Sequence, residues 1–408
     1  MELKMDYMSA VSAAQKWGIG IRQVQRLLAD GRIPNAQKLG NSWVIPVSAE
    51  KPLTRALIKS GTAESHIAVP LPVSLQERLA AMCKAVYINN SRDNPYGVID
   101  SIKDEKLRSF HIANLFYMKG DFKQAKRYCK TTEGDEAAKL LISGIAIAVA
   151  ISSGDYAFYD EYETFLKAVI KSKRGAEVTS YAELMLALGY MGAGLPEMAA
   201  EWIKKADFTN VYPVVKYTAI CLRIEYFRWQ KKYESMLSAA EAILSLSSDD
   251  LHREFNSIEI QLMTRCAIAC HYLDRMDEAK RWLMSAMDIA FPHGFTVLFT
   301  SIITDLSGLL ERCTKQAYPE YYDKIIAQSR QIVNNWVAFH IRCRKNDNAP
   351  FLLSIQEQKI ANLAARRVPY AEISRRLDLS LGTIKNTVQV IYSKMNVNNR
   401  DELYEALW

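Results

Sequence analysis

Residues 351–408 decide the fold of the C-terminal part of this chain, and they read FLLSIQEQKIANLAARRVPYAEISRRLDLSLGTIKNTVQVIYSKMNVNNRDELYEALW. Ser354 and Glu357 have the spacing of a capping box, in which the two side chains satisfy backbone amides that the first turn of a helix leaves unpaired. The sequence therefore predicts a helix that begins at about Ile355.

Two further helices follow, and each boundary has a local cause. Val368-Pro369 ends the first helical pattern, because proline cannot continue a helix and restricts the residue before it. A second helix is predicted over residues 370–377. Ser380 is well placed to cap a third helix, which runs from Leu381 to about Met395.

The third helix has two contrasting faces. One face collects the apolar residues Ile384, Val388, Ile391 and Met395. The opposite face collects Gly382, Lys385, Asn386, Gln389 and Ser393. Asn and Gln can pair with the major-groove edge of adenine, and Lys reaches guanine acceptors or phosphate. This is a candidate recognition helix for DNA, although an ordinary amphipathic helix with a solvated polar face would have the same periodicity.

The whole segment resembles the LuxR-type (GerE-like) DNA-binding domain, which is a four-helix helix-turn-helix unit. The resemblance rests on Leu353-Ser354, Glu357, Ile360, Leu363-Ala364, Glu372-Ile373, Leu377, Leu379-Ser380, Thr383-Ile384-Lys385, Lys394-Met395, Val397 and Arg400. By that resemblance, the DNA-binding residues are Thr383 at phosphate, then Lys385, Asn386 and Gln389 at base edges, with Ser393 on the same face. The helix over residues 400–407 would form the dimer contact.

Two positions depart from the pattern of this family. Arg367 stands where the family usually has a glycine between the first two helices, and Thr387 stands where it usually has a histidine. A side chain in a left-handed turn costs on the order of 1 kcal/mol, which a packed domain tolerates. The fold is therefore still expected, with contacts to the DNA backbone that can differ from those of typical members.

The N-terminal end carries a second helix-turn-helix pattern. Residues 9–16 are predicted to form a short helix, residues 17–20 a tight turn, and residues 21–29 another helix that Gly31 ends. A small β-hairpin is then predicted from Gln37-Lys38-Leu39, a Gly40-Asn41 turn and Trp43-Val44-Ile45-Pro46.

This order of elements is that of a winged helix, and the segment resembles the MerR/excisionase-type family. The resemblance rests on Ala13-Ala14, Trp17-Gly18, Gly31-Arg32-Ile33-Pro34, Gly40 and Trp43. It implies that the DNA-facing helix presents Arg22, Gln23, Gln25 and Arg26, and that the wing presents Lys38, Asn41 and Ser42.

Basic charge is concentrated at the two ends of the chain. The net charge is +4 up to Arg55 and +2 from Phe351 onward, out of +7 for the whole chain, so the long middle carries only about +1. Neutralisation of phosphates needs such a surplus where DNA is bound. An ordinary soluble surface could also carry it, so charge supports the motifs without replacing them.

The middle is predicted to be an array of paired helices. Gly120-Asp121-Phe122 and Gly154-Asp155-Tyr156 recur 34 residues apart, which is the period of a tetratricopeptide unit. The aligned small positions are Ala125, Tyr159, Ala199, Met236 and Ala279. The region resembles a degraded tetratricopeptide solenoid, whose inner surface would be available to a small-molecule or protein effector. A spacer or dimerisation role is an equal alternative.

The predicted fold is mainly all-α, with a winged helix at the N-terminus, a tetratricopeptide-like solenoid and a C-terminal helix-turn-helix domain. The expected boundaries are 1–55, a linker over 56–74, 75–343, a linker over 344–350, and 351–408. With 408 residues and 49% apolar content, the chain is long enough for two or three domains.

Other classes find little support in the sequence. The longest apolar run, residues 140–151, is too short to cross a bilayer, and no signal peptide is visible. The seven cysteines form no CxxC pair, which is typical of a reducing cytoplasm. Cys266 and Cys270 share a helix face and could bind metal, but small core residues are the better interpretation. No cofactor motif or catalytic set is present, so an enzyme is not expected.

The leading hypothesis is a cytoplasmic bacterial transcription factor that binds double-stranded DNA at both ends, as a homodimer, under control of its helical core. The alternative is a protein-interaction adaptor whose terminal modules do not bind DNA.

Overall fold

The computed structural model divides the chain into two compact units, residues 1–66 and residues 67–408. The residues that the structure describes are 7–17, 20–29, 33, 36–39, 42–46, 49, 74–86, 99–205, 209–246, 257–344 and 353–407. Most of the two predicted linkers, 56–74 and 344–350, lies outside these residues, although Arg344 belongs to a helix and Ser74 directly precedes one.

The N-terminal unit combines two helices with a small sheet. Its elements are β1 (Tyr7–Ser9), α1 (Ala10–Trp17), α2 (Ile21–Ala29), β2 (Gln37–Leu39) and β3 (Ser42–Pro46). The sheet is antiparallel with the order β1-β3-β2. The prediction of a two-stranded hairpin was therefore incomplete. Met8 pairs with Ile45 along the second edge of β3, so Ser9 belongs to a strand and the first helix starts one residue later.

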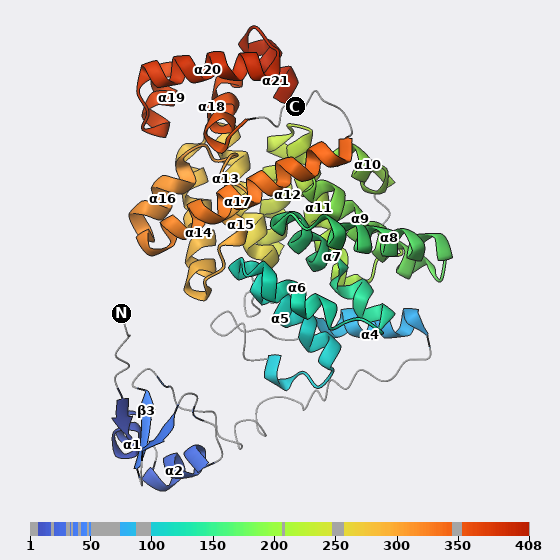
Figure 1. Ribbon diagram of the computed structural model, residues 1–408, viewed down its shortest axis with the longest axis vertical. Helices are drawn as coiled ribbons and strands as arrows, with labels where there is room; N and C mark the ends of the chain where they lie inside the picture. The colour runs from blue at the N-terminus through green and yellow to red at the C-terminus, as the bar shows by residue number, and fades with distance from the viewer. Residues whose placement is uncertain are drawn as a thin grey trace. The chain divides into compact units, whose positions relative to one another are not determined.

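The second unit begins with α4 and continues as five antiparallel helix pairs (Figure 1). The bounds are α4 (Leu75–Val86), α5 (Glu105–Lys119) with α6 (Phe122–Lys130), α7 (Glu136–Ser153) with α8 (Tyr156–Ser172), α9 (Ala176–Gly192) with α10 (Pro196–Lys205), α11 (Lys216–Trp229) with α12 (Tyr233–Leu246), and α13 (Ser257–Tyr272) with α14 (Met276–Ala290). Short 3-10 helices cover Ile99–Ser101 and Pro213–Val215.

The predicted repeat positions lie in corresponding places of these pairs. Each belongs to the second helix of its pair, and all five side chains are buried: Ala125, Tyr159, Ala199, Met236 and Ala279. The recurring Gly-Asp dipeptide forms the turn inside the first two pairs. Gly154, for example, adopts the left-handed conformation that ends α7, and Asp155 caps α8 by accepting from the amide of Phe158 at 3.1 Å.

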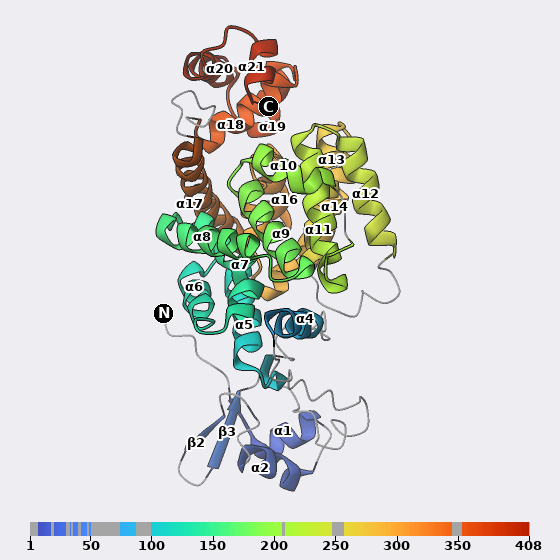
Figure 2. The ribbon, with the colours of Figure 1, turned by 90° about the vertical axis from the view of Figure 1, so that its right-hand side faces the viewer.

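The array is closed on itself, whereas the sequence predicted a solenoid and did not predict this closure. After a 3-10 turn at Phe291–His293 come α15 (Val297–Thr300), α16 (Leu309–Ala317) and α17 (Pro319–Arg344). The long helix α17 returns across the first pairs (Figures 1 and 2), where Gln328 donates to the carbonyl of Lys119 at 3.2 Å and Asn335 to that of Ser152 at 2.8 Å. Phe339 is fully buried against the ring of Tyr159. These contacts cover the inner surface with another helix.

The C-terminal helices have the bounds that the sequence predicted. They are α18 (Ile355–Ala365), α19 (Tyr370–Leu377), α20 (Leu381–Met395) and α21 (Arg400–Leu407). The capping box is confirmed, since Ser354 accepts from the amide of Glu357 at 3.3 Å and the Glu357 carboxylate accepts from that of Ser354 at 2.7 Å.

One helix of the array is as apolar as a membrane span. Among the described residues, α7 alone has the length and hydropathy to cross a bilayer, because the helix extends beyond the apolar run 140–151 at both ends. Its window is 67% buried among the neighbouring helices. Burial of this extent is typical of a helix in the core of a folded protein. The apolar character of α7 is therefore only weak evidence for a membrane location.

Candidate nucleic-acid interface

The recognition helix predicted from the sequence is α20, and its ends have clear causes. Ser380 caps the N-terminus by accepting from the amide of Thr383 at 3.0 Å. Asn396 adopts a left-handed conformation, with φ of 53°, that ends the helix. One face is packed into the domain core through fully buried side chains, namely Ile384, Val388 and Ile391.

The opposite face of α20 is exposed and brings the predicted DNA-binding residues together. Its exposed members are Thr383, Lys385, Asn386, Gln389 and Ser393. Because they recur at helical spacing, they form a strip along the helix. The hydroxyl of Thr383 lies 2.8 Å from that of Ser380, so it also belongs to the cap.

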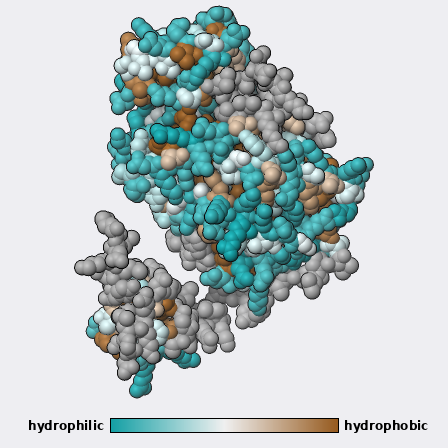
Figure 3. All heavy atoms as spheres, in the orientation of Figure 1, coloured by the Kyte–Doolittle hydropathy of each residue, from teal (hydrophilic) through white to brown (hydrophobic). Residues whose placement is uncertain are grey.

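Sequence reasoning missed an apolar member of this exposed surface. Val390 is 45% exposed and lies one turn after Asn386. Leu381 is also exposed, at the first turn, but it is in line with the buried residues Ile384 and Val388. Apolar side chains at a major groove can contact the methyl group of thymine. A signal was available, since Val390 is an apolar residue on an otherwise polar helix face. Figure 3 shows small apolar patches among hydrophilic atoms on the C-terminal domain.

An ion pair holds α20 against α18. Lys394 lies 2.8 Å from Glu357, whose carboxylate is also part of the capping box. Burial alone would raise the pKa of Glu357, but the hydrogen bonds from Lys394 and Ser354 outweigh it and lower that pKa. The start of α18 is thus tied directly to the last turn of the recognition helix.

Arg367 adopts the left-handed conformation expected for the position where the family has glycine. Its φ is 60°, and its guanidinium pairs with Asp401 at 2.6 Å on the surface. Thr387, the other departure, is half-buried on α20.

The C-terminal domain is docked on the helical array through α18 and its neighbours. Lys359 pairs with Glu311, and Arg366 donates to the carbonyl of His271 at 2.8 Å and lies 3.2 Å from Asp274. Asn362 donates to the carbonyl of Thr304 at 3.1 Å. The exposed strip of α20 takes no part in these contacts.

The last helix also faces the array. The ammonium group of Lys231 lies 3.7 Å from the ring centroid of Tyr404, which is a cation–π contact. The exposed positions of α21 are acidic: Asp401, Glu402 and Glu405. The resemblance to the LuxR-type family assigns the dimer contact to α21. Part of α21 is therefore in contact with the array.

In the N-terminal unit, α2 presents three of the predicted residues to solvent. Arg22, Gln25 and Arg26 are exposed, while Val24 and Leu28 pack into the core on the other side. Gln23 lies on α2, Lys38 on β2 and Ser42 on β3, but their side chains, like the whole of Asn41, lie outside the described residues.

The described residues contain no cluster of three or more potential metal ligands. Cys266 and Cys270 are both fully buried in the core around α13. Burial raises the pKa of Cys270 to about 11, so its thiol is protonated at neutral pH.

Comparison with known proteins identifies the C-terminal domain. Residues 352–407 match the family of bacterial regulatory proteins called the luxR family, so the chain carries a helix-turn-helix domain of that family. The monoamine regulon transcriptional regulator of Klebsiella aerogenes is 32% identical over 65 residues, which cover 16% of this chain and 29% of that protein. No solved structure matches the chain. A DNA-binding domain typical of transcriptional regulators is thus present, and the other parts rest on the structure alone.

Proposed function

We propose that this protein regulates transcription by inserting α20 into the major groove, with Lys385, Asn386 and Gln389 at base edges. The observation that carries the proposal is the exposed polar strip of α20, whose other side is buried in a domain of the luxR family. The helix is tied to α18 by an ion pair, so the strip is held in one orientation. Val390 would contact a thymine methyl group.

Footprinting of genomic DNA, followed by affinity measurement on a protected site, tests this assignment. Lys385→Ala and Gln389→Ala should each weaken discrimination against a mismatched base pair by about 1–3 kcal/mol. The matched controls are Lys123→Ala and Gln356→Ala, which remove exposed side chains on α6 and α18. Unchanged protection of the same sites in both α20 variants would refute the assignment.

A second DNA contact is proposed for α2 of the N-terminal unit. Arg22 and Arg26 are exposed on the side of α2 opposite its buried residues, and the unit has a net positive charge. Such residues neutralise phosphates, so replacing either by Ala should reduce the slope of log affinity against log salt by about one. Equal slopes in the variants and the unmodified protein would count against this module.

We also propose that the helical array controls dimerisation of the C-terminal domain by keeping this domain docked. Tyr404 contacts the array, so dimerisation through its face of α21 requires the domain to leave that position. A protein that acts in this way on DNA would work in the cytoplasm. If the purified chain retained a protein partner but showed no salt-sensitive binding to duplex DNA, the adaptor function would replace this proposal.

A further inference from the structure

The closed array surrounds a cavity of about 650 Å³. Its walls come from α5, α7, α9, α11, α13, the segment after α15, and α17. Apolar side chains from three of these helices line one part, including Leu188, Met191, Leu222 and Trp336. The volume and the mainly apolar lining are those of sites that enclose a small organic molecule.

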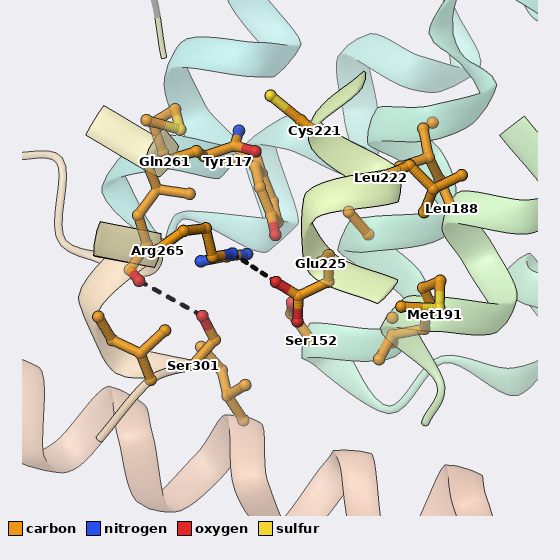
Figure 4. A pocket seen from close by; sticks show the side chains of 18 of the residues that line it. Tyr117, Ser152, Leu188, Met191, Cys221, Leu222, Glu225, Gln261, Arg265 and Ser301 are labelled. Carbon is orange, nitrogen blue, oxygen red and sulfur yellow. Dashed lines mark hydrogen bonds and ion pairs between the residues drawn. The ribbon is translucent and has the colours of Figure 1, made fainter. Parts of the chain in front are cut away.

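Four charged groups meet in another part of the cavity wall. Arg228 pairs with Glu225 at 2.6 Å and with Asp305 at 2.9 Å, and Arg265 reaches from α13 to the second oxygen of Glu225 (Figure 4). Burial would raise the pKa of Glu225, but the two guanidinium groups outweigh it and lower that pKa. The carboxylate of Glu225 is therefore ionised and has an arginine on each oxygen.

Unused hydrogen-bond donors lie at this end of the cavity, together with Oε2 of Glu225, which is ion-paired with Arg265 but accepts no hydrogen bond among the described residues. The described pairs use only Nε and Nη1 of Arg228 and Arg265, although each guanidinium carries five N–H bonds. The indole nitrogen of Trp229 is buried and has no hydrogen-bond partner among the described residues. An acceptor-rich group would satisfy these donors, and a carboxylate pairs with guanidinium N–H groups in favourable geometry.

A histidine that also lines the cavity has an unsatisfied ring nitrogen. His111 is 8% exposed, and within the described part of the chain its Nε2 has no partner. Burial lowers the pKa of His111 to about 4, so the ring is neutral at pH 7 and offers one further polar contact. An unpartnered polar atom buried at a cavity wall is costly unless a bound molecule pairs with it.

We propose that the cavity binds a small organic carboxylate with an apolar, partly aromatic body. The carboxylate lies against Arg265, Arg228 and Trp229, and the body lies among Leu188, Met191 and Trp336. A cationic ligand of the same shape would meet two guanidinium groups and carboxylates that already have partners, so it binds more weakly.

The site includes residues of the DNA-binding domain, and this part of the inference rests on the proposed function. Gln358 and Asn362 of α18 and Leu407 of α21 line the cavity together with the array. A molecule that extends from the array residues to these side chains contacts both and binds the docked arrangement more tightly than a separated one. By linkage, its binding stabilises docking of the domain.

Binding of 4-phenylbutyrate and of 4-phenylbutylamine to the full chain, measured by equilibrium dialysis, tests the site. The two probes share a body and differ in the charge of the head. We expect saturable 1:1 binding of the acid, and affinity for the amine that is lower by about tenfold or more. Equal affinity for the two probes, or no saturable binding of the acid, would overturn the proposal.

Three variants locate the bound probe. Arg265→Gln removes a guanidinium, Trp229→Phe keeps the ring but removes the indole N–H, and Ala148→Phe fills the cavity. Each should weaken binding of the acid by about tenfold. Arg275→Gln is the matched control, because Arg275 also pairs with a glutamate of another helix but on the surface. If Arg265→Gln does not fold, the other two variants decide, and undiminished binding by both would refute the site.

Hydrogen exchange of α18 amides measures the coupling to the DNA-binding domain. The acid should slow this exchange in the unmodified protein and not in Ala148→Phe. Exchange that is unaffected by bound acid would refute the coupling. Neither assay contains DNA, so failure of this inference is distinguishable from failure of DNA binding, which footprinting measures separately.

Discussion

At the scale of single residues, the C-terminal domain contains a backbone position that its side chain does not favour. Arg367 has a φ of 60°, a region that glycine enters without cost. The ion pair of Arg367 with Asp401 offers little compensation, because both side chains are 72% exposed and solvent screens their attraction. The strain is local and therefore removable.

Arg367→Gly is expected to stabilise the C-terminal domain by about 1 kcal/mol or slightly less. The free energy of opening of α18 and α19, measured by hydrogen exchange, provides the test. Asp401→Asn is the control, because it removes the ion pair and leaves the backbone strain. A domain that became less stable with glycine would contradict the strain argument.

At the scale of elements, one carboxylate connects two helices. Glu357 completes the capping box of α18 and pairs with Lys394 of α20. Its lowered pKa means that the ionised form is favoured by folding. Its contribution to stability is therefore fully present above the ordinary pKa of 4.5 and is lost as the pH falls through the lowered value.

Glu357→Gln should destabilise the domain at pH 7 by about 1 kcal/mol, because it weakens the cap and removes the charge that faces Lys394. The difference from the unmodified protein should shrink as the solution is acidified. Lys394→Met separates the two effects, since it leaves the cap intact. A pH-independent difference would show that the charge of Glu357 is unimportant.

At the scale of the whole second unit, the docking of the C-terminal domain depends on a few polar contacts. The Lys359–Glu311 pair connects α18 with α16, and its side chains are only 12% and 16% exposed. Breaking one partner of such a pair leaves a poorly solvated charge. Figures 1 and 2 show α18 beside the array, with α20 on the other side of the domain.

Lys359→Glu should loosen the docked domain by about 1–3 kcal/mol, because it places two carboxylates together. Faster hydrogen exchange of α18 and an increased fraction of dimer in sedimentation would follow. The double variant Lys359→Glu with Glu311→Lys should restore both. If the double variant showed the same fast exchange and the same fraction of dimer as the single variant, the Lys359–Glu311 pair would not be what keeps the domain docked.

Lowering the pH should weaken the docking of the C-terminal domain on the array, because His271 at this interface becomes protonated. Burial, and then the charges of Arg366, Arg376 and Arg312, lower the pKa of His271 to about 3 from an ordinary 6.5. The folded state therefore resists protonation, and its stability falls as the pH drops from about 6.5 toward 3. Exchange of α18 measured at pH 7 and pH 5 should differ less in His271→Gln than in the unmodified protein. His293→Gln is the control, and an equal pH response in all three proteins would exclude His271 as the cause.

The boundaries of α18 to α20 and the exposed strip of α20 were predictable from the amino-acid sequence, because caps, proline and helical periodicity act within a few residues. That the middle of the chain consists of paired helices was also predictable from the spacing of apolar residues, while its resemblance to tetratricopeptide repeats stays a prediction. The third strand was not, because the pairing of Met8 with Ile45 depends on chain segments that are distant in sequence. The closure of the array, its cavity and the docking of the C-terminal domain also lay beyond prediction. They depend on contacts such as Gln328 with Lys119, which are 209 residues apart and have no local pattern that specifies them.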